Sequence, residues 1–176
     1  MIIRPVCSGD AAVLATIYAH HVIHGTASYE TVPPDAAEME RRIARVVSAG
    51  WPWLIAEDDR GVVLGYAYAT QFRDRAAYRF VCEDSIYIRH DCCGKGLGKA
   101  LLAALIEACE AVGFRQMIAV IGGAEPASEA LHASLGFSGA GRLRSIGRKH
   151  GRWLDTLYMQ RVLGNGAATK PEQEPG

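Results

Sequence analysis

Three glycines stand at alternate positions directly before a helical run, in the stretch 92–99, which reads CCGKGLGK. Glycine adopts positive φ at little steric cost and lets other groups approach the backbone, but it destabilises regular structure. A helix N-terminus carries about half a positive charge and several unpaired N–H groups. The pattern therefore indicates a backbone cradle for a phosphate or pyrophosphate, although an ordinary tight turn would use the same glycines.

Two familiar phosphate motifs do not fit this loop. Walker A would need glycine at position 93 and Ser or Thr after Lys99, where Cys93 and Ala100 stand. The Rossmann fingerprint spaces its glycines as G-x-G-x-x-G, whereas these alternate as G-x-G-x-G. The glycines alone therefore do not identify the ligand.

Hydrophobic spacing and turn residues predict the elements that would position the loop. The apolar segment 83–88 leads into it as a strand, and the run KALLAALIEACEAVGF after it has one apolar helical face. Two earlier helices are expected after the capping residues Ser8 and Asp35, and a β-hairpin around the turn 58–61. Strands at 2–4, 117–121, 137–143 and 153–163 and a short helix at 128–134 complete a mixed α/β domain.

Composition limits the class of protein. Nineteen basic and nineteen acidic residues cancel, which argues against a general attraction to nucleic acid or to an anionic membrane. The N-terminus has no long apolar run after its charges, and no later segment offers about eighteen uncharged apolar residues. We therefore expect a cytoplasmic protein with a single domain at 1–163 and a disordered tail at 164–176.

Neither a disulfide framework nor a metal site is expected. Five cysteines are an odd number, and the adjacent pair Cys92 and Cys93 lacks the spacing of zinc ligands. His20 and His24 stand four apart on one helical face, but no third ligand is evident nearby. Reduced thiols and a metal-free protein are the expectation.

Three stretches taken together resemble the GNAT N-acetyltransferase superfamily: EDSIYI at 83–88, CGKGLG at 93–98 and SEALHASLGF at 128–137. The segments WPWLIAE, RAAYRF, VIGG and RKHGRWLDTLYMQ extend the resemblance to its branch of phosphinothricin and methionine sulfoximine acetyltransferases. The resemblance covers nearly everything before the tail. It implies a GNAT-like fold, in which helices flank a central mixed, mostly antiparallel sheet.

The resemblance also implies acetyl-CoA as co-substrate and answers why the loop is so rich in glycine. Backbone amides of the loop would bind the pyrophosphate, and the preceding strand would hold the pantetheine. Cys93 stands where the family usually has Gln or Arg, and Glu125 where this branch usually has Asn. The implied cofactor-binding residues are Ile86, Tyr87, Ile88, Cys93, Gly94, Lys95, Gly96, Leu97, Gly98, Lys99, Glu125 and Ser128.

Acetyl transfer to an amine needs a base, because free amines near neutral pH are mostly protonated. Glu83 matches the catalytic glutamate of the branch, with Asp84 as the fallback base. His132 occupies the position where many members of the superfamily place a tyrosine that protonates the departing thiolate. A histidine can donate a proton near neutral pH, although one histidine on a short helix is also commonly a capped or packed residue.

By the same resemblance the small amino-acid pocket would be lined by Tyr29, Glu30, Arg73, Arg75, Tyr78, Lys149 and His150. The leading interpretation is an N-acetyltransferase that acts on a small amino acid or analogue by direct transfer through a ternary complex. A peptide or protein N-terminal acetyltransferase and a noncatalytic acyl-CoA-binding module remain as alternatives. The resemblance further suggests a homodimer.

Overall fold

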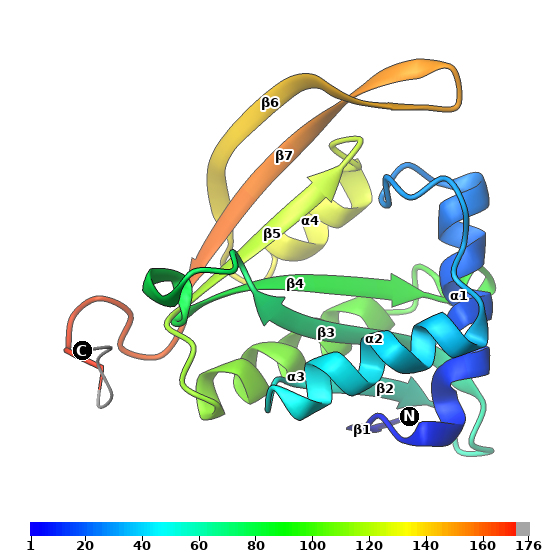
Figure 1. The fold of residues 1–176 in the computed structure, drawn as a ribbon, viewed down its shortest axis with the longest axis horizontal. Helices are drawn as coiled ribbons and strands as arrows, with labels where there is room; N and C mark the ends of the chain where they lie inside the picture. The colour runs from blue at the N-terminus through cyan, green and yellow to red at the C-terminus, as the bar shows by residue number, and fades with distance from the viewer. Residues whose placement is uncertain (172–176) are drawn as a thin grey trace.

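One sheet of seven strands forms the centre of the molecule, in the order β1-β2-β3-β4-β5-β7-β6 (Figure 1). The computed structural model describes residues 1–171. Only β4 and β5 are parallel, and the other neighbouring pairs are antiparallel. The expected mixed, mostly antiparallel sheet is thereby confirmed. Its strands are β1 Ile2–Pro5, β2 Trp53–Glu57, β3 Val63–Gln71, β4 Val81–Ile88, β5 Gln116–Gly122, β6 Ser138–Lys149 and β7 Arg152–Val162.

Helices cover both faces of this sheet. α1 (Ala11–His24) and α2 (Ala36–Ser48) pack against one face, over a core that includes Ile55 and Tyr66. α3 (Leu97–Ala111) packs against the other face, over Ala56 and Ala67. Because successive side chains of a strand point to opposite faces, neighbouring residues of β2 and β3 serve different cores. The short α4 is Pro126–Ala133, and three 3₁₀ turns span Ser8–Asp10, Ala76–Tyr78 and His90–Cys92.

Most of the predicted elements are confirmed within a few residues. The side chain of Asp35 caps α2 by accepting a hydrogen bond of 2.7 Å from the Glu38 N–H. The strand expected at 137–143 is longer than predicted, since β6 continues to Lys149 through register shifts between Leu143 and Gly147. These irregularities interrupt the alternation of side chains that a sequence pattern relies on.

The described part of the segment after β7, residues 163–171, contacts the rest of the domain. Arg115 donates hydrogen bonds to the Gly166 carbonyl at 3.4 Å and to Thr169 at 3.0 Å. The predicted disordered tail falls partly on residues 172–176, which lie outside the described residues. Within residues 1–171, no helix combines the length and the apolar character that crossing a membrane requires.

The parallel pair β4 and β5 stays together for only part of its length. Pairing runs from Val81 and Gln116 to Asp84 and Ala119. Beyond that point β4 continues to pair with β3 as far as Ile88, and β5 continues with β7 as far as Gly122. The sheet therefore opens between β4 and β5, and Figure 1 shows the two strands diverging.

Gly65 allows β3 to lie close to β4, and its replacement tests this packing. A Cβ atom at Gly65 would lie 2.7 Å from Ile88 Cδ1 and 2.8 Å from the Tyr87 carbonyl oxygen. We expect Gly65→Ala to lower the free energy of unfolding by about 1–3 kcal/mol, the usual range for overpacking. Gly139→Ala on β6 is the control, because a Cβ there meets no atom within 4 Å. Urea denaturation of both variants checks this, and equal stabilities would contradict the tight β3–β4 contact.

Candidate active site

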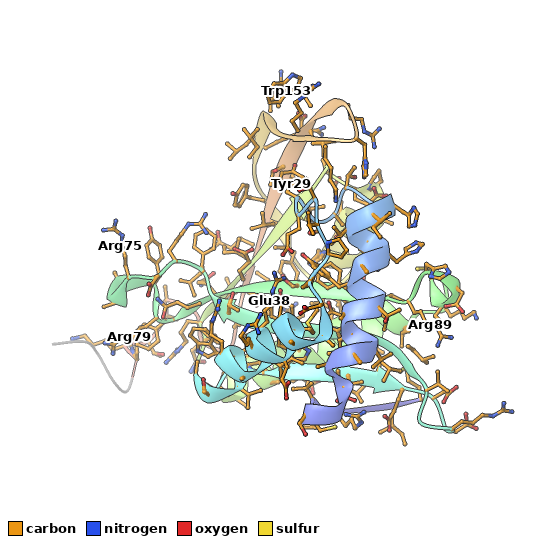
Figure 2. All side chains as sticks on the ribbon, turned by 45° about the vertical axis from the view of Figure 1, so that its right-hand side comes forward. Tyr29, Glu38, Arg75, Arg79, Arg89 and Trp153 are labelled. Carbon is orange, nitrogen blue, oxygen red and sulfur yellow. The ribbon has the colours of Figure 1, made fainter. Side chains whose placement is uncertain are left out.

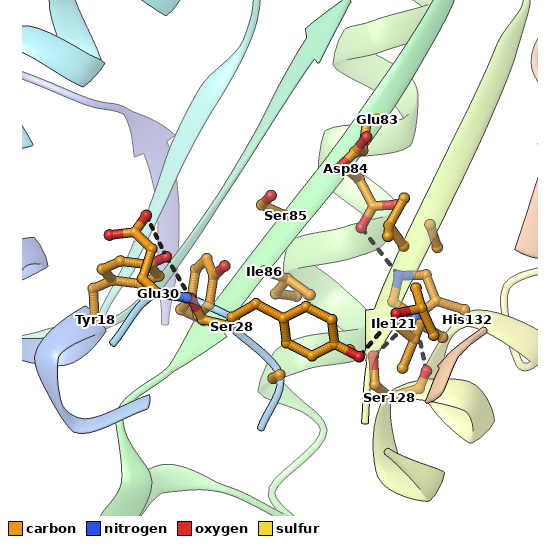
Figure 3. A pocket seen from close by; sticks show the side chains of 17 residues that line it. Tyr18, Ser28, Glu30, Glu83, Asp84, Ser85, Ile86, Ile121, Ser128 and His132 are labelled. Atoms are coloured by element: carbon orange, nitrogen blue, oxygen red, sulfur yellow. Dashed lines mark hydrogen bonds and ion pairs between the residues drawn. The ribbon is translucent and has the colours of Figure 1, made fainter. Parts of the chain in front are cut away.

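A cavity of about 450 Å³ lies where β4 and β5 separate (Figure 3). Residues of both strands line it, together with α1, the α1–α2 loop, α4 and β7. It therefore draws on parts of the chain that are far apart in sequence. Its lining includes Tyr18, Ser28, Tyr29, Glu30, Glu83, Asp84, Ile86, Tyr87, Ser128, His132 and Thr156.

Glu83 supplies a carboxylate suited to taking up a proton. Its side chain is about one-third exposed, and Arg73 Nη1 lies 3.8 Å from Glu83 Oε2. Burial raises the pKa of Glu83, the Arg73 guanidinium opposes this shift, and the Asp84 carboxylate adds to it. A raised pKa brings a carboxylate closer to the operating range of a general base near neutral pH.

Asp84 and His132 form a second titratable pair in the cavity wall. His132 Nε2 lies 3.0 Å from Asp84 Oδ2, and the exposed fractions of the two side chains are 3% and 2%. His132 Nδ1 lies 2.7 Å from the Ser128 carbonyl oxygen, which can only accept, so Nδ1 carries a proton. Burial lowers the pKa of His132, but the hydrogen bond and charge of Asp84 and the bond to Ser128 outweigh it and raise the pKa.

Tyr29 connects the α1–α2 loop by hydrogen bonds to β7 and to the end of β5. Its hydroxyl lies 2.8 Å from Thr156 Oγ1 and from the Asp155 carbonyl oxygen, and it accepts from the Gly123 N–H at 3.2 Å. A Cβ at Gly147 of β6 would lie 2.5 Å from the Tyr29 ring, so only glycine leaves room for it. The loop, β5 and the β6–β7 hairpin thus meet at one side chain.

Two further contacts hold the same loop against the hairpin. Lys149 is 5% exposed, and its ammonium group donates to the Ser28 carbonyl at 2.6 Å. Burial lowers the pKa of Lys149, and the charge of Glu30 opposes this shift. His150 Nε2 donates to the Gly25 carbonyl at 3.2 Å. These contacts therefore hold the α1–α2 loop, whose residues Ser28, Tyr29 and Glu30 line the cavity, against the β6–β7 hairpin.

A hydrogen-bonded network fixes Glu30 at the edge of the cavity. Arg42 donates to both carboxylate oxygens of Glu30, at 2.8 and 3.2 Å. The Tyr18 hydroxyl donates to the same carboxylate at 3.0 Å and lies 2.7 Å from the Ser28 hydroxyl. Because Arg42 neutralises Glu30, this carboxylate is less suited than Glu83 to acting as a free base.

The glycine loop presents bare backbone at the start of α3. Gly94 and Gly96 have φ values of +77° and +76°, and a Cβ at either position would meet nothing within 4 Å. Gly96 is the N-cap residue, and no side chain caps the helix. The first N–H groups of α3 are therefore available to an anion, and Lys95 and Lys99 add positive charge beside them. Cys93 is exposed and its thiol lies 3.7 Å from the Arg89 carbonyl oxygen.

The structure brings together many of the residues expected from sequence. Glu83, Ile86, Tyr87, Tyr29, Glu30, Ser128 and His132 all line the cavity. Ile88 lies beyond it, where its carbonyl accepts from His21 Nε2 at 2.8 Å. Glu125 is the N-cap residue of α4.

The other expected substrate contacts lie outside the cavity lining. Arg75 projects from the β3–β4 connection, well away from Tyr29 (Figure 2). Tyr78 is 39% exposed on the same connection, and Lys149 and His150 line a separate hollow beside α1. Of the expected basic residues Arg73, Arg75, Lys149 and His150, only Arg73 lies beside a carboxylate of the cavity lining, with its Nη1 3.8 Å from Glu83 Oε2.

Sequence reasoning missed several residues of the site. Tyr18 and Thr156 reach the cavity through packing of distant elements, for which the local sequence gives no signal. The sequence indicates Asp84 only as a fallback for Glu83, because its buried partner His132 lies 48 positions away along the chain. The sequence does offer one signal. Asp84 directly follows Glu83 on a strand, and adjacent strand residues face opposite sides of the sheet, so the two carboxylates have different surroundings.

Comparison with known proteins agrees with this geometry. Residues 3–158 match the model of the acetyltransferase (GNAT) domain. The chain is 53% identical over 171 residues to phosphinothricin N-acetyltransferase of Alcaligenes faecalis, covering 97% of this chain and 86% of that protein. It is 39% identical over 158 residues to L-methionine sulfoximine/L-methionine sulfone acetyltransferase of Pseudomonas aeruginosa, covering 90% and 92%.

A solved structure is similar throughout. The GNAT phosphinothricin acetyltransferase from Sinorhizobium meliloti, in complex with AcCoA, superposes with a TM-score of 0.96 at 52% identity. The match covers 98% of this chain and 93% of that one. The chain therefore belongs to the GNAT acetyltransferase family, as its sequence motifs predicted.

Proposed function

We propose that this protein is an acetyl-CoA-dependent N-acetyltransferase that acetylates the amine of a small amino acid or an analogue of the phosphinothricin or methionine sulfoximine type. The observation that carries the proposal is the position of Glu83, a carboxylate of raised pKa, in the cavity between β4 and β5. The similarity to phosphinothricin and methionine sulfoximine acetyltransferases supports the substrate class.

The residues at the start of α3 fit a CoA pyrophosphate. The uncapped N–H groups and the open space beside Gly94 and Gly96 suit an anion, and Lys95 and Lys99 complement its charge. In this proposal the backbone of 86–88 holds the pantetheine, and Cys93, Glu125 and Ser128 lie beside the cofactor. Acetyl-CoA would supply the activated acyl group as a thioester.

Glu83 would prepare the amine for attack, in a direct transfer within a ternary complex. A protonated amine has no lone pair, so Glu83 or a water held by it takes the proton before the new C–N bond forms. His132 would provide the proton required by the sulfur as the C–S bond breaks. Glu83 and His132 approach the cavity from different elements, which leaves the space between them for the reacting groups.

The size and closure of the cavity favour a small substrate. A volume of about 450 Å³ lies within the usual range for small-molecule sites. Tyr29 and Lys149 hold the α1–α2 loop across one side, where an extended peptide would need an open slot. Arg73, whose guanidinium lies 3.8 Å from the Glu83 carboxylate, would attract a substrate carboxylate.

We also propose a cytoplasmic homodimer. All five cysteines are free thiols, which suits a reducing compartment. β6 is an edge strand of the sheet, and exposed edges favour pairing or contact with another chain. Trp153 extends from the far end of the β6–β7 hairpin (Figure 2) and is 62% exposed, with Leu143 and Ile146 also exposed on β6. These apolar groups suit burial against a second copy.

Release of free CoA from acetyl-CoA tests the proposed activity. Phosphinothricin, methionine sulfoximine, methionine sulfone and a short peptide with a free N-terminus are compared as acceptors. We expect turnover with at least one of the amino acid analogues and much lower kcat/KM with the peptide. Preference for the peptide would support the alternative N-terminal acetyltransferase. Tight CoA binding without turnover of any acceptor would support a noncatalytic module.

Glu83→Gln tests the base. The amide retains the shape but cannot accept the amine proton, so kcat/KM at pH 7 should fall by about 10²- to 10⁴-fold. The deficit should shrink toward pH 10, because more of the amine is then neutral without help. Steady-state rates across the pH range check this, with Glu107→Gln on the exposed face of α3 as control. Unchanged kinetics in a folded Glu83→Gln enzyme would remove Glu83 from the mechanism.

Gly96→Ala tests the phosphate cradle. Gly113, at the other end of α3, also has a positive φ and open space around it, so Gly113→Ala imposes a similar backbone strain away from the loop. We expect both variants to lose similar stability, whereas only Gly96→Ala should weaken CoA binding, by about tenfold or more. Calorimetric titration with CoA measures this. Equal affinities of the two variants would argue against the cradle.

A further inference from the structure

We propose that Asp84 is a positioning residue for the acetyl transfer: it holds His132 in its doubly protonated form, so that the buried pair supplies the proton taken by the departing thiolate. This inference rests on the proposed N-acetyltransferase function. It assigns Asp84 a role distinct from the base role of Glu83. It also explains how a histidine that is almost wholly buried can carry an exchangeable proton.

Counting protons in the hydrogen bonds leads to this assignment. The Ser128 carbonyl fixes a hydrogen on His132 Nδ1. If His132 were neutral and Asp84 ionised, Nε2 and Oδ2 would face each other at 3.0 Å as two acceptors with no hydrogen between them. The pair must therefore retain one further proton. With the proton on Nε2, the arrangement is an imidazolium and a carboxylate, whose charges cancel.

The surroundings of the pair keep that proton in place. Asp84 is the last residue of β4 to pair with β5, so its side chain is fixed by the sheet on one side and α4 on the other. The Phe137 ring meets the His132 ring edge-on, with centroids 4.9 Å apart. Ala119 and Ile121 of β5 add only apolar surface to the cavity wall. Loss of the proton from His132 would leave the Asp84 carboxylate buried without its counter-charge, which is costly in surroundings of low polarity.

Few other titratable groups can compete for this proton. Glu83 is the next carboxylate along β4, and alternation along the strand directs it to the opposite face, toward Arg73. Cys82 shares the face of Asp84, but its hydrogen bond with Cys109 and its burial raise the pKa of its thiol. Thr156 of β7 and Ser128 of α4 contribute neutral groups. Among the described residues, Asp84 is the charged group that shifts the pKa of His132 upward.

Glu83 and the Asp84–His132 pair lie on opposite faces of β4, so the protons leaving nitrogen and the proton reaching sulfur follow separate routes. Glu83 passes the first proton of the ammonium to solvent before attack, and the nitrogen gives its second proton to Glu83 as the C–N bond forms. The C–S bond breaks, and its electron pair on sulfur takes the proton held between His132 and Asp84. The pair is then left as a neutral imidazole beside a carboxylate, a state that its own geometry disfavours, and solvent returns a proton after the products leave. The nitrogen therefore loses its protons on one side of β4, and the sulfur gains its proton from the other side.

The protonation state of His132 can be measured without any substrate. In protein labelled with ¹³C and ¹⁵N at histidine, His132→Gln assigns the signal, and the wild-type ring should remain doubly protonated above its usual pKa of about 6.5. In Asp84→Asn the side-chain amide can donate to Nε2 of a neutral ring, so the pKa should fall by about one unit or more. A wild-type His132 that is neutral at pH 6.5 would overturn the inference, whether or not Asp84→Asn folds.

Kinetics provide the second test. The ratio of kcat/KM between Asp84→Asn and wild type cancels the titration of the amine, which both enzymes share. This ratio should be nearest to one at the lowest pH of the profile, where the variant's imidazole is most protonated, and should fall about tenfold or more by pH 8.5. The conservative variant Asp84→Glu, which retains the charge, should show a smaller fall. A ratio that is low but constant with pH would mean that Asp84 only supports the structure.

These outcomes separate the inference from the proposed function. If wild-type protein releases no CoA with any acceptor, the proposed function fails while the NMR titration still reports on the pair. If wild-type protein is active and the ratio does not vary with pH, the proposed function stands and the inference fails. His24→Gln, at the exposed end of α1, is the control and should leave both the His132 titration and the rate ratio unchanged.

Discussion

The end of pairing between β4 and β5 is the constraint on which the rest of the site depends. Asp84 and Ala119 form the last pair, yet both strands continue, because β3 still holds β4 and β7 still holds β5. The facing edges of residues 85–88 and 120–122 have no strand partner among the described residues. Backbone groups without partners need water or a ligand. We therefore propose that the opening is a binding slot with its own hydrogen-bonding groups.

This opening also connects the two faces of the sheet. Glu83 and Asp84 are neighbours on β4, so one side chain faces the α1–α2 side and the other faces α4. The α1–α2 side carries the polar network around Glu30, and the other side leads to the glycine loop at the start of α3. A reaction that needs a base for the amine and an acid for the sulfur suits this division. In the proposed mechanism Glu83 serves the amine on one face of β4, and Asp84 serves the sulfur through His132 on the other face.

Much of this architecture could be predicted from local sequence, and the exceptions have physical causes. The helices, the β4 strand and the glycine loop follow from apolar spacing, caps and glycine chemistry, which are properties of neighbouring residues. The extension of β6 to Lys149 was missed because a bulge breaks its alternation. The contact of Tyr29 with Thr156 spans 127 positions, and the placement of Lys149 against Ser28 depends on how the hairpin meets the loop. The partnership of Asp84 with His132 likewise required α4 to be docked on the sheet.

Hydrogen–deuterium exchange with and without saturating acetyl-CoA tests the central claim most directly, because it reads the backbone at the opening itself. The account predicts slower exchange in segments 85–88 and 119–122 and at the first turn of α3, with no change in β2, which lies away from the opening. Protection confined to other segments, with 85–88 and 119–122 unchanged by bound cofactor, would contradict the claim that the separated strands form the binding slot.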